Sequence, residues 1–255
     1  LALNGGTIND GSGNAGTLTL PTPGTANSLG ANSNIIIDTT VPTVSDVTTT
    51  TVDGSYNDDD DPIPIIIEFT EAVIVNTDNG TPQLTLAIGT PNAVASYASG
   101  TGTTELTFNY TIADGHNSSD LDYASTVALI LNGGAIDDAA GNAASLTLAA
   151  PGAANSLGDN SDIIIDTTVP TVSDVTTTTA NGSYNDADDA IPIIIEFSEA
   201  VNVTGSPQLT LETGGTDAVV DYTSGTGSTE LTFNYTIADG HNISDLDYTG
   251  TDALD

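Results

Sequence analysis

Residues 35–47 read Ile-Ile-Ile-Asp-Thr-Thr-Val-Pro-Thr-Val-Ser-Asp-Val, and residues 163–175 repeat them letter for letter. β-Branched residues favour strands, and proline is confined to the ends and edges of sheets because it lacks an amide donor. The stretch therefore predicts the last strand of one module, a short stiff joint, and the first strand of the next module. We expect the rest of the chain to be organised between two such joints.

The repeat extends over the whole sequence. An offset of 128 residues relates the first part of each period, and an offset of 125 relates the second part. The offset changes where residues 76–81 shorten to residues 204–206. A deletion in a segment rich in Asn, Gly and Thr, between apolar runs, indicates a surface hairpin loop. Pairs related in this way include Leu3/Leu131, Asp38/Asp166 and Glu71/Glu199 before the deletion, and His116/His241 and Tyr123/Tyr248 after it.

Three pieces follow from this spacing. Residues 1–40 match the C-terminal part of a module, residues 41–168 a complete module, and residues 169–255 the N-terminal part of a further module. We expect either a window on a longer array or a subunit whose neighbours complete its halves by exchanging strands.

The hydrophobic pattern within a period is that of strands. Leu106, Phe108, Tyr110 and Ile112 alternate with polar residues, which is the period of two of a half-buried strand. The Ser-Gly-Thr-Gly run at 99–102 is a hairpin signal. We predict an all-β chain of tandem Ig-like antiparallel β-sandwiches in a linear array. The predicted strands are Val41–Thr51, Pro64–Val75 with a bulge near Glu71, Gln83–Ile88, Ala93–Ala98, Glu105–Ala113, Leu129–Leu131, Ser145–Leu148 and Ile163–Ile165.

The charge balance excludes several functions. The chain has 35 acidic residues, no Lys and no Arg, and a net charge of −35. A nucleic-acid partner needs protein cations, and an anionic membrane surface would repel this chain. No apolar run approaches the roughly 18 residues that a membrane helix needs, so we predict no membrane insertion. Without Cys there are no disulfides and no thiolate metal sites.

Clustered carboxylates indicate a metal ion. Carboxylates at this density weaken the compact state unless metal ions or concentrated salt neutralise them. Ca²⁺ takes six to eight oxygen ligands in flexible geometry, which these loops can supply, so we predict Ca²⁺. The alternative is that the loops are merely solvated. The candidate loop ligands are Asp10, Asp59, Asp61, Asp114, Asp120, Asp122, Asp138, Asp239, Asp245 and Asp247.

A second kind of candidate lies at the joints. Asp38 and Asp166 stand where one module meets the next, and Glu71 and Glu199 stand on long strands. A joint carboxylate, a loop carboxylate and one from the neighbouring sandwich could share an ion and fix the bend angle. The alternative for Glu71 is a place on the solvent face of its strand.

Enzymatic activity is not expected. Each module has one histidine, His116 or His241. Such a residue could act as a metal ligand or a base, and the alternative is an exposed loop residue without a chemical role. Paired carboxylates would suit glycoside hydrolysis, but the chain has no Trp and few aromatic residues to form a sugar platform. We also do not expect an enzyme to repeat its site in tandem.

Four motifs taken together resemble a known family. They are Asp-Thr-Thr-Val-Pro-Thr-Val at the joint, Glu-Phe-Ser-Glu-Ala-Val at 196–201, Asp-Asp-Ala-Ala-Gly-Asn at 137–142 and Ser-Asp-Leu-Asp-Tyr at 119–123. They resemble the tandem bacterial Ig-like repeats of giant surface adhesins and extracellular fibre proteins. The resemblance implies cadherin-like strings of sandwiches, secreted to the cell surface and rigidified by Ca²⁺ at module junctions. By position it implies ligands at Asp138 and Asp10 in the late loop, Asp38 and Asp166 at the joint, and Glu71 and Glu199 on the strand.

This chain departs from that pattern in its lack of Lys and Arg and in the run Asp58–Asp61. We expect a non-enzymatic structural repeat of an extracellular filament or adhesin stalk, active in cell adhesion or biofilm, with copies of itself as head-to-tail partners. One alternative is a calcium-dependent carbohydrate- or surface-binding module, with surface glycans as partners. Another is a halophile surface-layer protein without discrete ion sites.

Overall fold

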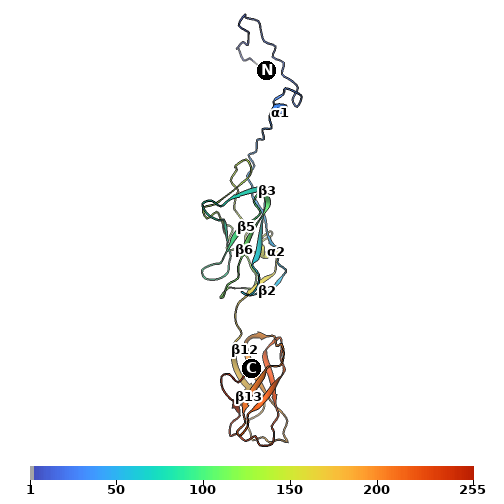
Figure 1. Ribbon diagram of the computed structural model, residues 1–255, viewed down its shortest axis with the longest axis vertical. Helices are drawn as coiled ribbons and strands as arrows, with labels where there is room; N and C mark the ends of the chain where they lie inside the picture. The colour runs from blue at the N-terminus through green and yellow to red at the C-terminus, as the bar shows by residue number, and fades with distance from the viewer. Residues whose placement is uncertain (1–2) are drawn as a thin grey trace. The chain divides into compact units, whose positions relative to one another are not determined.

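The regular secondary structure of the described residues is almost all β-strand, in mainly antiparallel sheets, which confirms the predicted all-β class. The computed structural model describes residues 3–255 and divides into two compact units, residues 1–167 (unit 1) and 168–255 (unit 2). Figure 1 traces both along the chain. The described part has two helices, α1 (Leu29–Asn32) and α2 (Leu157–Asn160), each of four residues and far too short to cross a membrane.

Unit 1 is built around one long strand, β3 (Ile63–Asn76). It pairs antiparallel with β1 on one side and with β6 on the other, and its last residues pair with β9. The sheet continues in the order β1-β3-β6-β5-β4-β8. Figure 1 shows β3, β5 and β6 in this unit. The remaining bounds are β1 Val44–Thr49, β4 Gln83–Thr85, β5 Val94–Ser99, β6 Thr103–Tyr110, β8 Leu129–Ile130 and β9 Ala135–Asp137.

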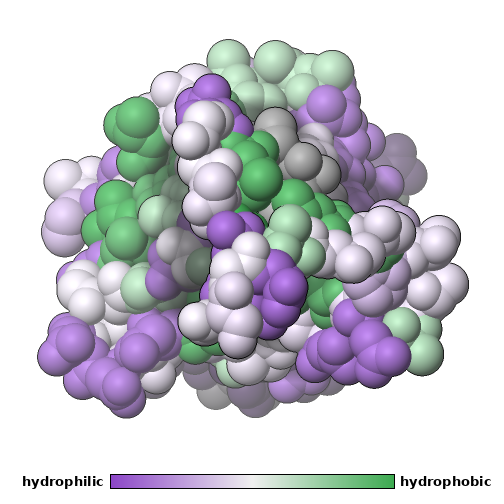
Figure 2. Space-filling view, turned by 90° about the horizontal axis from the view of Figure 1, so that it is seen from above, coloured by the Kyte–Doolittle hydropathy of each residue, from purple (hydrophilic) through white to green (hydrophobic). Residues whose placement is uncertain are grey.

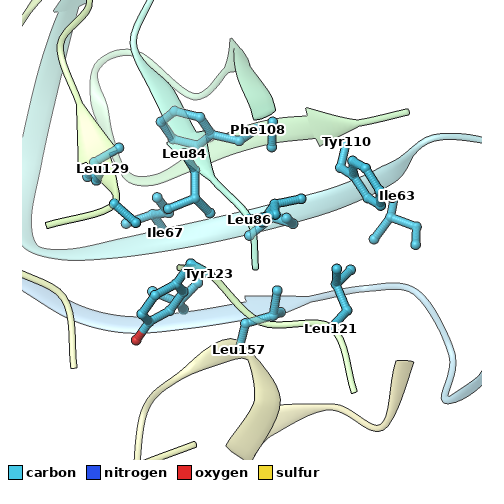
Figure 3. Packing of buried hydrophobic residues seen from close by; sticks show 14 of the residues in the cluster. Ile63, Ile67, Leu84, Leu86, Phe108, Tyr110, Leu121, Tyr123, Leu129 and Leu157 are labelled. Atoms are coloured by element: carbon cyan, nitrogen blue, oxygen red, sulfur yellow. The ribbon is translucent and has the colours of Figure 1, made fainter. Parts of the chain in front are cut away.

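The core of unit 1 comes from the alternation in these strands. On β3, Ile63, Ile65 and Ile67 are buried, while Ile66 between them is only partly covered. On β6, the predicted inward face is confirmed, since Leu106, Phe108 and Tyr110 are all fully buried. Figure 3 shows Ile63, Ile67, Phe108 and Tyr110 packed with buried side chains from later in the unit.

The predicted bulge in β3 is also confirmed. The register between β3 and β6 shifts between Glu68 and Val73. An irregular register removes residues from the regular alternation and re-aims their side chains. Glu71 lies inside this interval, so it does not take a regular place on the solvent face of the sheet.

A second, three-stranded sheet in unit 1 holds the later copy of the Ile-Ile-Ile-Asp stretch. The strand β10 (Ile163–Asp166) runs parallel to β2 (Gly54–Tyr56) and antiparallel to β7 (Asn117–Ser118). Ile163 and Ile165 are buried, and Ile164 between them is exposed.

The earlier copy does not form a strand, so that expectation is wrong for Ile35–Ile37. These three residues have no strand assignment and are all exposed. A strand needs a partner for its backbone amides and carbonyls, and identical residues adopt it only where β2 and β7 are present. The predicted strand Ser145–Leu148 is likewise wrong, because only Ser145 forms a bridge, to Thr43, although Leu148 is buried.

Unit 2 repeats the main sheet of unit 1. Its strands run in the order β11-β12-β15-β14-β13-β16, and β11, β12 and β15 pair in the same registers as their repeat-equivalents β1, β3 and β6. A separate core of buried residues, including Ile195, Phe233 and Tyr235, fills it. Figure 1 labels β12 and β13 in this unit. The bounds are β11 Val172–Thr177, β12 Ile191–Val201, β13 Gln208–Glu212, β14 Ala218–Ser224, β15 Ser228–Tyr235 and β16 Asp247–Tyr248.

The hairpin between β5 and β6 gives a matched stability test. Gly100 and Gly102 both have positive φ, 108° and 83°. A Cβ on Gly100 would overlap the carbonyl oxygen of Glu105, whereas one on Gly102 would meet nothing. We expect Gly102→Ala to lower the free energy of unfolding by about 1 kcal/mol and Gly100→Ala by about 3 kcal/mol or more. Denaturant unfolding measures both, and equal losses would contradict the described turn.

Candidate metal site

Three predicted ligands meet in unit 1. One carboxylate oxygen each from Asp38, Glu71 and Asp138 lies within 4.8 Å of the other two. Asp38 comes from the joint before β1, Glu71 from the irregular part of β3, and Asp138 from the loop that follows β9. Asp138 is buried and the other two are partly buried. Three segments that are distant in sequence therefore converge on one acidic point.

The loop that carries Asp138 holds its carboxylate in a fixed orientation. Oδ1 of Asp138 accepts hydrogen bonds from the amides of Ala140 and Asn142, both at 2.8 Å. Oδ2 accepts a hydrogen bond from Nδ2 of Asn142 at 2.7 Å. These donors favour the ionised form, and they lower the pKa of Asp138 although its burial opposes this. The loop thus presents a carboxylate rather than a carboxylic acid.

Asn142 also connects this loop to the joint. Its Nδ2 lies 3.2 Å from the backbone oxygen of Asp38 and donates to it. The side chain of Asp38 is oriented separately, since its Oδ1 accepts a hydrogen bond from the Thr40 amide at 2.9 Å. Sequence reasoning did not single out Asn142, although it ends the quoted Asp-Asp-Ala-Ala-Gly-Asn motif. Asn142 is an outer residue that holds the carboxylate of Asp138 and the backbone of the joint at Asp38.

Glu71 is the member whose charge nothing in the described residues compensates. Its Oε1 is inaccessible to solvent and has no hydrogen-bond partner. Burial raises the pKa of Glu71, and the negative charges of Asp38 and Asp138 raise it further. A buried oxygen acceptor without a donor is costly, and this protein has no Lys or Arg to supply one. The arrangement suits a cation.

The predicted loop acids Asp120 and Asp122 belong to a second acidic group. A side chain at Gly158 would meet one oxygen of each, so both lie against α2. Asp122 accepts a hydrogen bond from the Gly152 amide at 2.8 Å. Burial raises the pKa of Asp120, and the charges of Asp122 and then Asp162 add to this. Asp162 was missed from the sequence. The signal available was that the otherwise repeated stretch has Asn34 at this position.

The other predicted ligands do not join a group of three. Among residues 3–255, Asp38, Glu71 and Asp138 are the one set of three acidic or histidine side chains close enough to hold an ion together. Glu199 repeats one feature of Glu71, because its Oε1 is also buried without a hydrogen-bond partner. The acids found exposed are Asp10, Asp59, Asp61, Asp114, Asp120, Asp166, Asp239, Asp245 and Asp247.

Both histidines make a structural contact. Nδ1 of His116 lies 2.9 Å from the Tyr110 hydroxyl and accepts a hydrogen bond from the Ala113 amide at 3.3 Å. His241 repeats the contact with Tyr235 at 2.8 Å. Burial raises the pKa of Tyr110 to about 12, so its hydroxyl stays protonated at neutral pH. Asp114 and His116 line an open depression on the surface, but no further acid completes a ligand set there.

The raised pKa of Glu71 predicts how stability changes with pH in chelator. A carboxyl group whose pKa is raised by folding adds stability below its ordinary pKa of 4.5, and this is lost as the pH rises through the raised value. We expect Glu71→Gln to remove this loss, so that the variant is more stable than the parent at neutral pH in chelator. Calorimetry at pH 4 to 8 tests this, with Glu68→Gln, at an exposed residue of the same strand, as control. A parent that is the more stable at pH 7 would contradict it.

The chemistry open to this cluster follows from its donors. Three carboxylates, with no imidazole and no thiolate, favour a hard divalent cation such as Ca²⁺ over Zn²⁺ or copper. The cluster contains no nucleophile activated by a base. A comparison of this chain with protein-family models, with curated proteins and with solved structures finds no match.

Proposed function

We propose that this chain is a structural repeat of an extracellular filament or adhesin stalk, built from Ig-like sandwiches in a linear array and stiffened by Ca²⁺ at Asp38, Glu71 and Asp138. The observation that carries this proposal is the Oε1 of Glu71, which is buried, lacks a hydrogen-bond donor and lies beside two further carboxylates. A bound cation would supply the missing positive charge. The remaining ligands would be water and backbone oxygens, as is common for Ca²⁺.

The position of the three acids supports a mechanical role. Asp38 immediately follows the exposed Ile35–Ile37 and precedes β1. Glu71 and Asp138 belong to the sheet and to the loop after β9. An ion held by all three would fix the direction in which the chain enters β1 and the main sheet of unit 1. A repeated joint fixed in this way gives a stiff string rather than a flexible one.

The described aromatic residues favour this role over glycan binding. Sugar-binding sites use exposed aromatic rings as platforms. Among the described residues, the most exposed aromatic side chains are Tyr184 and Tyr248, each 41% exposed, and both belong to unit 2. The carboxylate group belongs to unit 1, so no exposed ring of its own unit accompanies it.

Calcium is expected to raise the thermal stability of unit 1. An ion that binds only the folded state adds about 2.7 kcal/mol at a concentration of 100 Kd. For a unit of this size that corresponds to a rise in Tm of roughly 5–10 °C. Calorimetry with calcium and with chelator, at constant ionic strength, measures the shift, and titration calorimetry gives the Kd.

Glu71→Gln provides the control for this shift. In chelator the variant should be more stable than the parent, because the amide lacks the negative charge that is repelled by Asp38 and Asp138. In calcium it should be less stable than the parent, because the same missing charge weakens Ca²⁺ binding. If calcium gave no shift and sodium chloride alone restored stability, discrete sites would be excluded. The halophile surface-layer alternative would then be preferred.

The outer residue Asn142 gives an independent test. Removing a side chain that orients metal ligands typically weakens binding 10–100-fold, and we expect that loss for Asn142→Ala. The matched control is Asn14→Ala, because Asn14 makes the same contacts to Asp10, at 2.8 Å, in an exposed segment. Titration calorimetry on both variants checks this. Equal calcium affinities for the two would show that the Asp138 loop does not form the site.

A further inference from the structure

The chain enters and leaves unit 1 at opposite ends of the main sheet (Figure 1). At the entry, the Thr43 amide donates a hydrogen bond to Oγ1 of Thr70 on β3 at 3.1 Å, and the Thr70 amide donates to the Thr43 oxygen at 2.9 Å. At the exit, Oγ1 of Thr167 donates to the His116 oxygen at 3.0 Å. The His116 ring contacts the last residue of β6, which pairs with the first residue of β3. Tension between the entry and the exit therefore acts along β3.

The strands next to the entry and the exit run in the same direction. β1 runs from the entry toward the exit, since its first residue pairs with Phe69 and its last with Ile65. β10 ends at Asp166, beside the exit residue Thr167. β2 is parallel to β10 and so also runs toward the exit. Tension pulls β2 back toward the entry, through β1, and pulls β10 forward through the exit. Two neighbouring parallel strands are thus pulled in opposite directions along their length.

A β-ladder resists this direction of pulling most strongly. The hydrogen bonds of a ladder run between the strands, so a force along the strands loads all of them at the same time. A force that separates the strands at one end loads the bonds one after another. Forced unfolding is governed by the rate of unfolding rather than by equilibrium stability. The orientation of β2 and β10 is therefore a source of mechanical resistance in its own right.

The start of β10 is fixed to the start of β2. The Asp162 amide donates a hydrogen bond to Oδ1 of Asp53 at 3.0 Å. The Gly54 amide donates to the Asp162 oxygen at 3.1 Å. Both bonds join the segment before β10 to the beginning of β2, so β10 cannot slide toward the exit without breaking them.

The end of β10 is fixed by Thr167, which is only 9% exposed. Its amide donates a hydrogen bond to Oδ1 of Asn117 at 2.9 Å. Its hydroxyl donates to the His116 oxygen and accepts a hydrogen bond from the Gly115 amide, both at 3.0 Å. One side chain and its own amide therefore tie the exit to three successive residues of the loop before β7.

The burial pattern of β10 also opposes sliding. Hydrophobic character alone does not identify the residues that hold the strand, since Figure 2 shows hydrophobic residues at the surface among hydrophilic ones. Ile164, in the middle of β10, is itself 40% exposed, whereas Ile163 and Ile165 are at most 1% exposed. A slip by one residue turns every side chain of a strand to the opposite face. Sliding β10 would therefore move two isoleucines out of the core.

We propose that β10, held against β2 and β7, is the mechanical clamp of unit 1, the element whose lengthwise displacement limits unfolding under tension. This rests on the proposed function, because a filament or stalk is the setting in which the chain carries tension. The ion site would hold the entry at Asp38, and the clamp holds the exit at Thr167.

The direction of pulling tests the clamp in the 255-residue chain, which has no native cysteine to compete for attachment. Val41→Cys/Val169→Cys, at exposed residues, loads unit 1 lengthwise and leaves Asp38 and the rest of unit 2 outside the load. Val52→Cys/Asp159→Cys, also at exposed residues, separates β2 and β10 from their first ends. Single-molecule force spectroscopy should give a lengthwise unfolding force roughly two- to threefold higher, because the three pairs of the β2–β10 ladder break together. Equal forces in the two directions would overturn the proposal.

Thr167→Val tests the exit contact. The variant should unfold about 10-fold faster at a given lengthwise force, since losing the hydroxyl leaves two buried backbone groups without their hydrogen bonds. Thr104→Val, at an exposed position of β6, is the matched control and should unfold at the parent's rate. An unchanged rate for Thr167→Val, in a variant that circular dichroism shows to be folded, would contradict the clamp.

Leu129→Ala separates a mechanical role from ordinary stability. Leu129 is buried on β8, at the opposite edge of the main sheet from β1, so it lies outside the proposed path of the force. The variant should lower the Tm at least as much as Thr167→Val and yet keep a lengthwise unfolding force close to that of the parent. Unfolding forces that simply followed the Tm across these variants would show that β10 has no special mechanical role.

The ion site and the clamp fail separately, because the lengthwise attachment points leave Asp38 out of the load. A lengthwise force that exceeds the separating force in chelator, with no effect of calcium on Tm, would keep the clamp and remove the ion site. A calcium-dependent Tm with equal forces in the two directions would keep the ion site and remove the clamp.

Discussion

The carboxylate of Glu71 places the strongest constraint on this molecule. Its Oε1 is buried without a donor, and Asp38 and Asp138 stand beside it. In an ordinary protein an arginine or lysine would compensate this charge, but neither residue occurs here. The repulsion must be relieved by protonation or by a cation. The raised pKa of Glu71 favours protonation, and a ligand set made only of oxygen atoms favours binding of a cation.

A second constraint is that a segment forms a strand only where the edge of a sheet offers it hydrogen-bond partners. The residues Ile-Ile-Ile-Asp form β10 between β2 and β7, and the same letters at 35–38 are extended and exposed. β12 stops at Val201 where β3 continues along β9. The residues of a segment therefore determine which strand it can pair with. Whether the segment forms a strand depends on whether that partner strand is present. The two copies of the repeat show both states in one chain.

The parts of the fold that depend on local sequence pattern could be predicted from the sequence. The inward face of β6 follows from a strict alternation, and the bulge in β3 follows from Glu71 interrupting an apolar run. The strand at Ile35–Ile37 was wrong because propensity does not report whether a partner is present. For the site, carboxylate type and repeat position placed Asp38, Glu71 and Asp138 among fourteen candidate ligands, and the family resemblance named these three positions. Asn142 was missed because it acts through a tertiary contact between two segments that are distant in sequence.

Diffraction from crystals of the calcium-bound chain, recorded at a wavelength where calcium scatters anomalously, tests the central claim most directly. The account predicts an anomalous peak surrounded by oxygens of Asp38, Glu71 and Asp138 at about 2.3–2.6 Å. Absence of a peak at saturating calcium, with Glu71 hydrogen-bonded as a neutral carboxylic acid to one of its acidic neighbours, would contradict it.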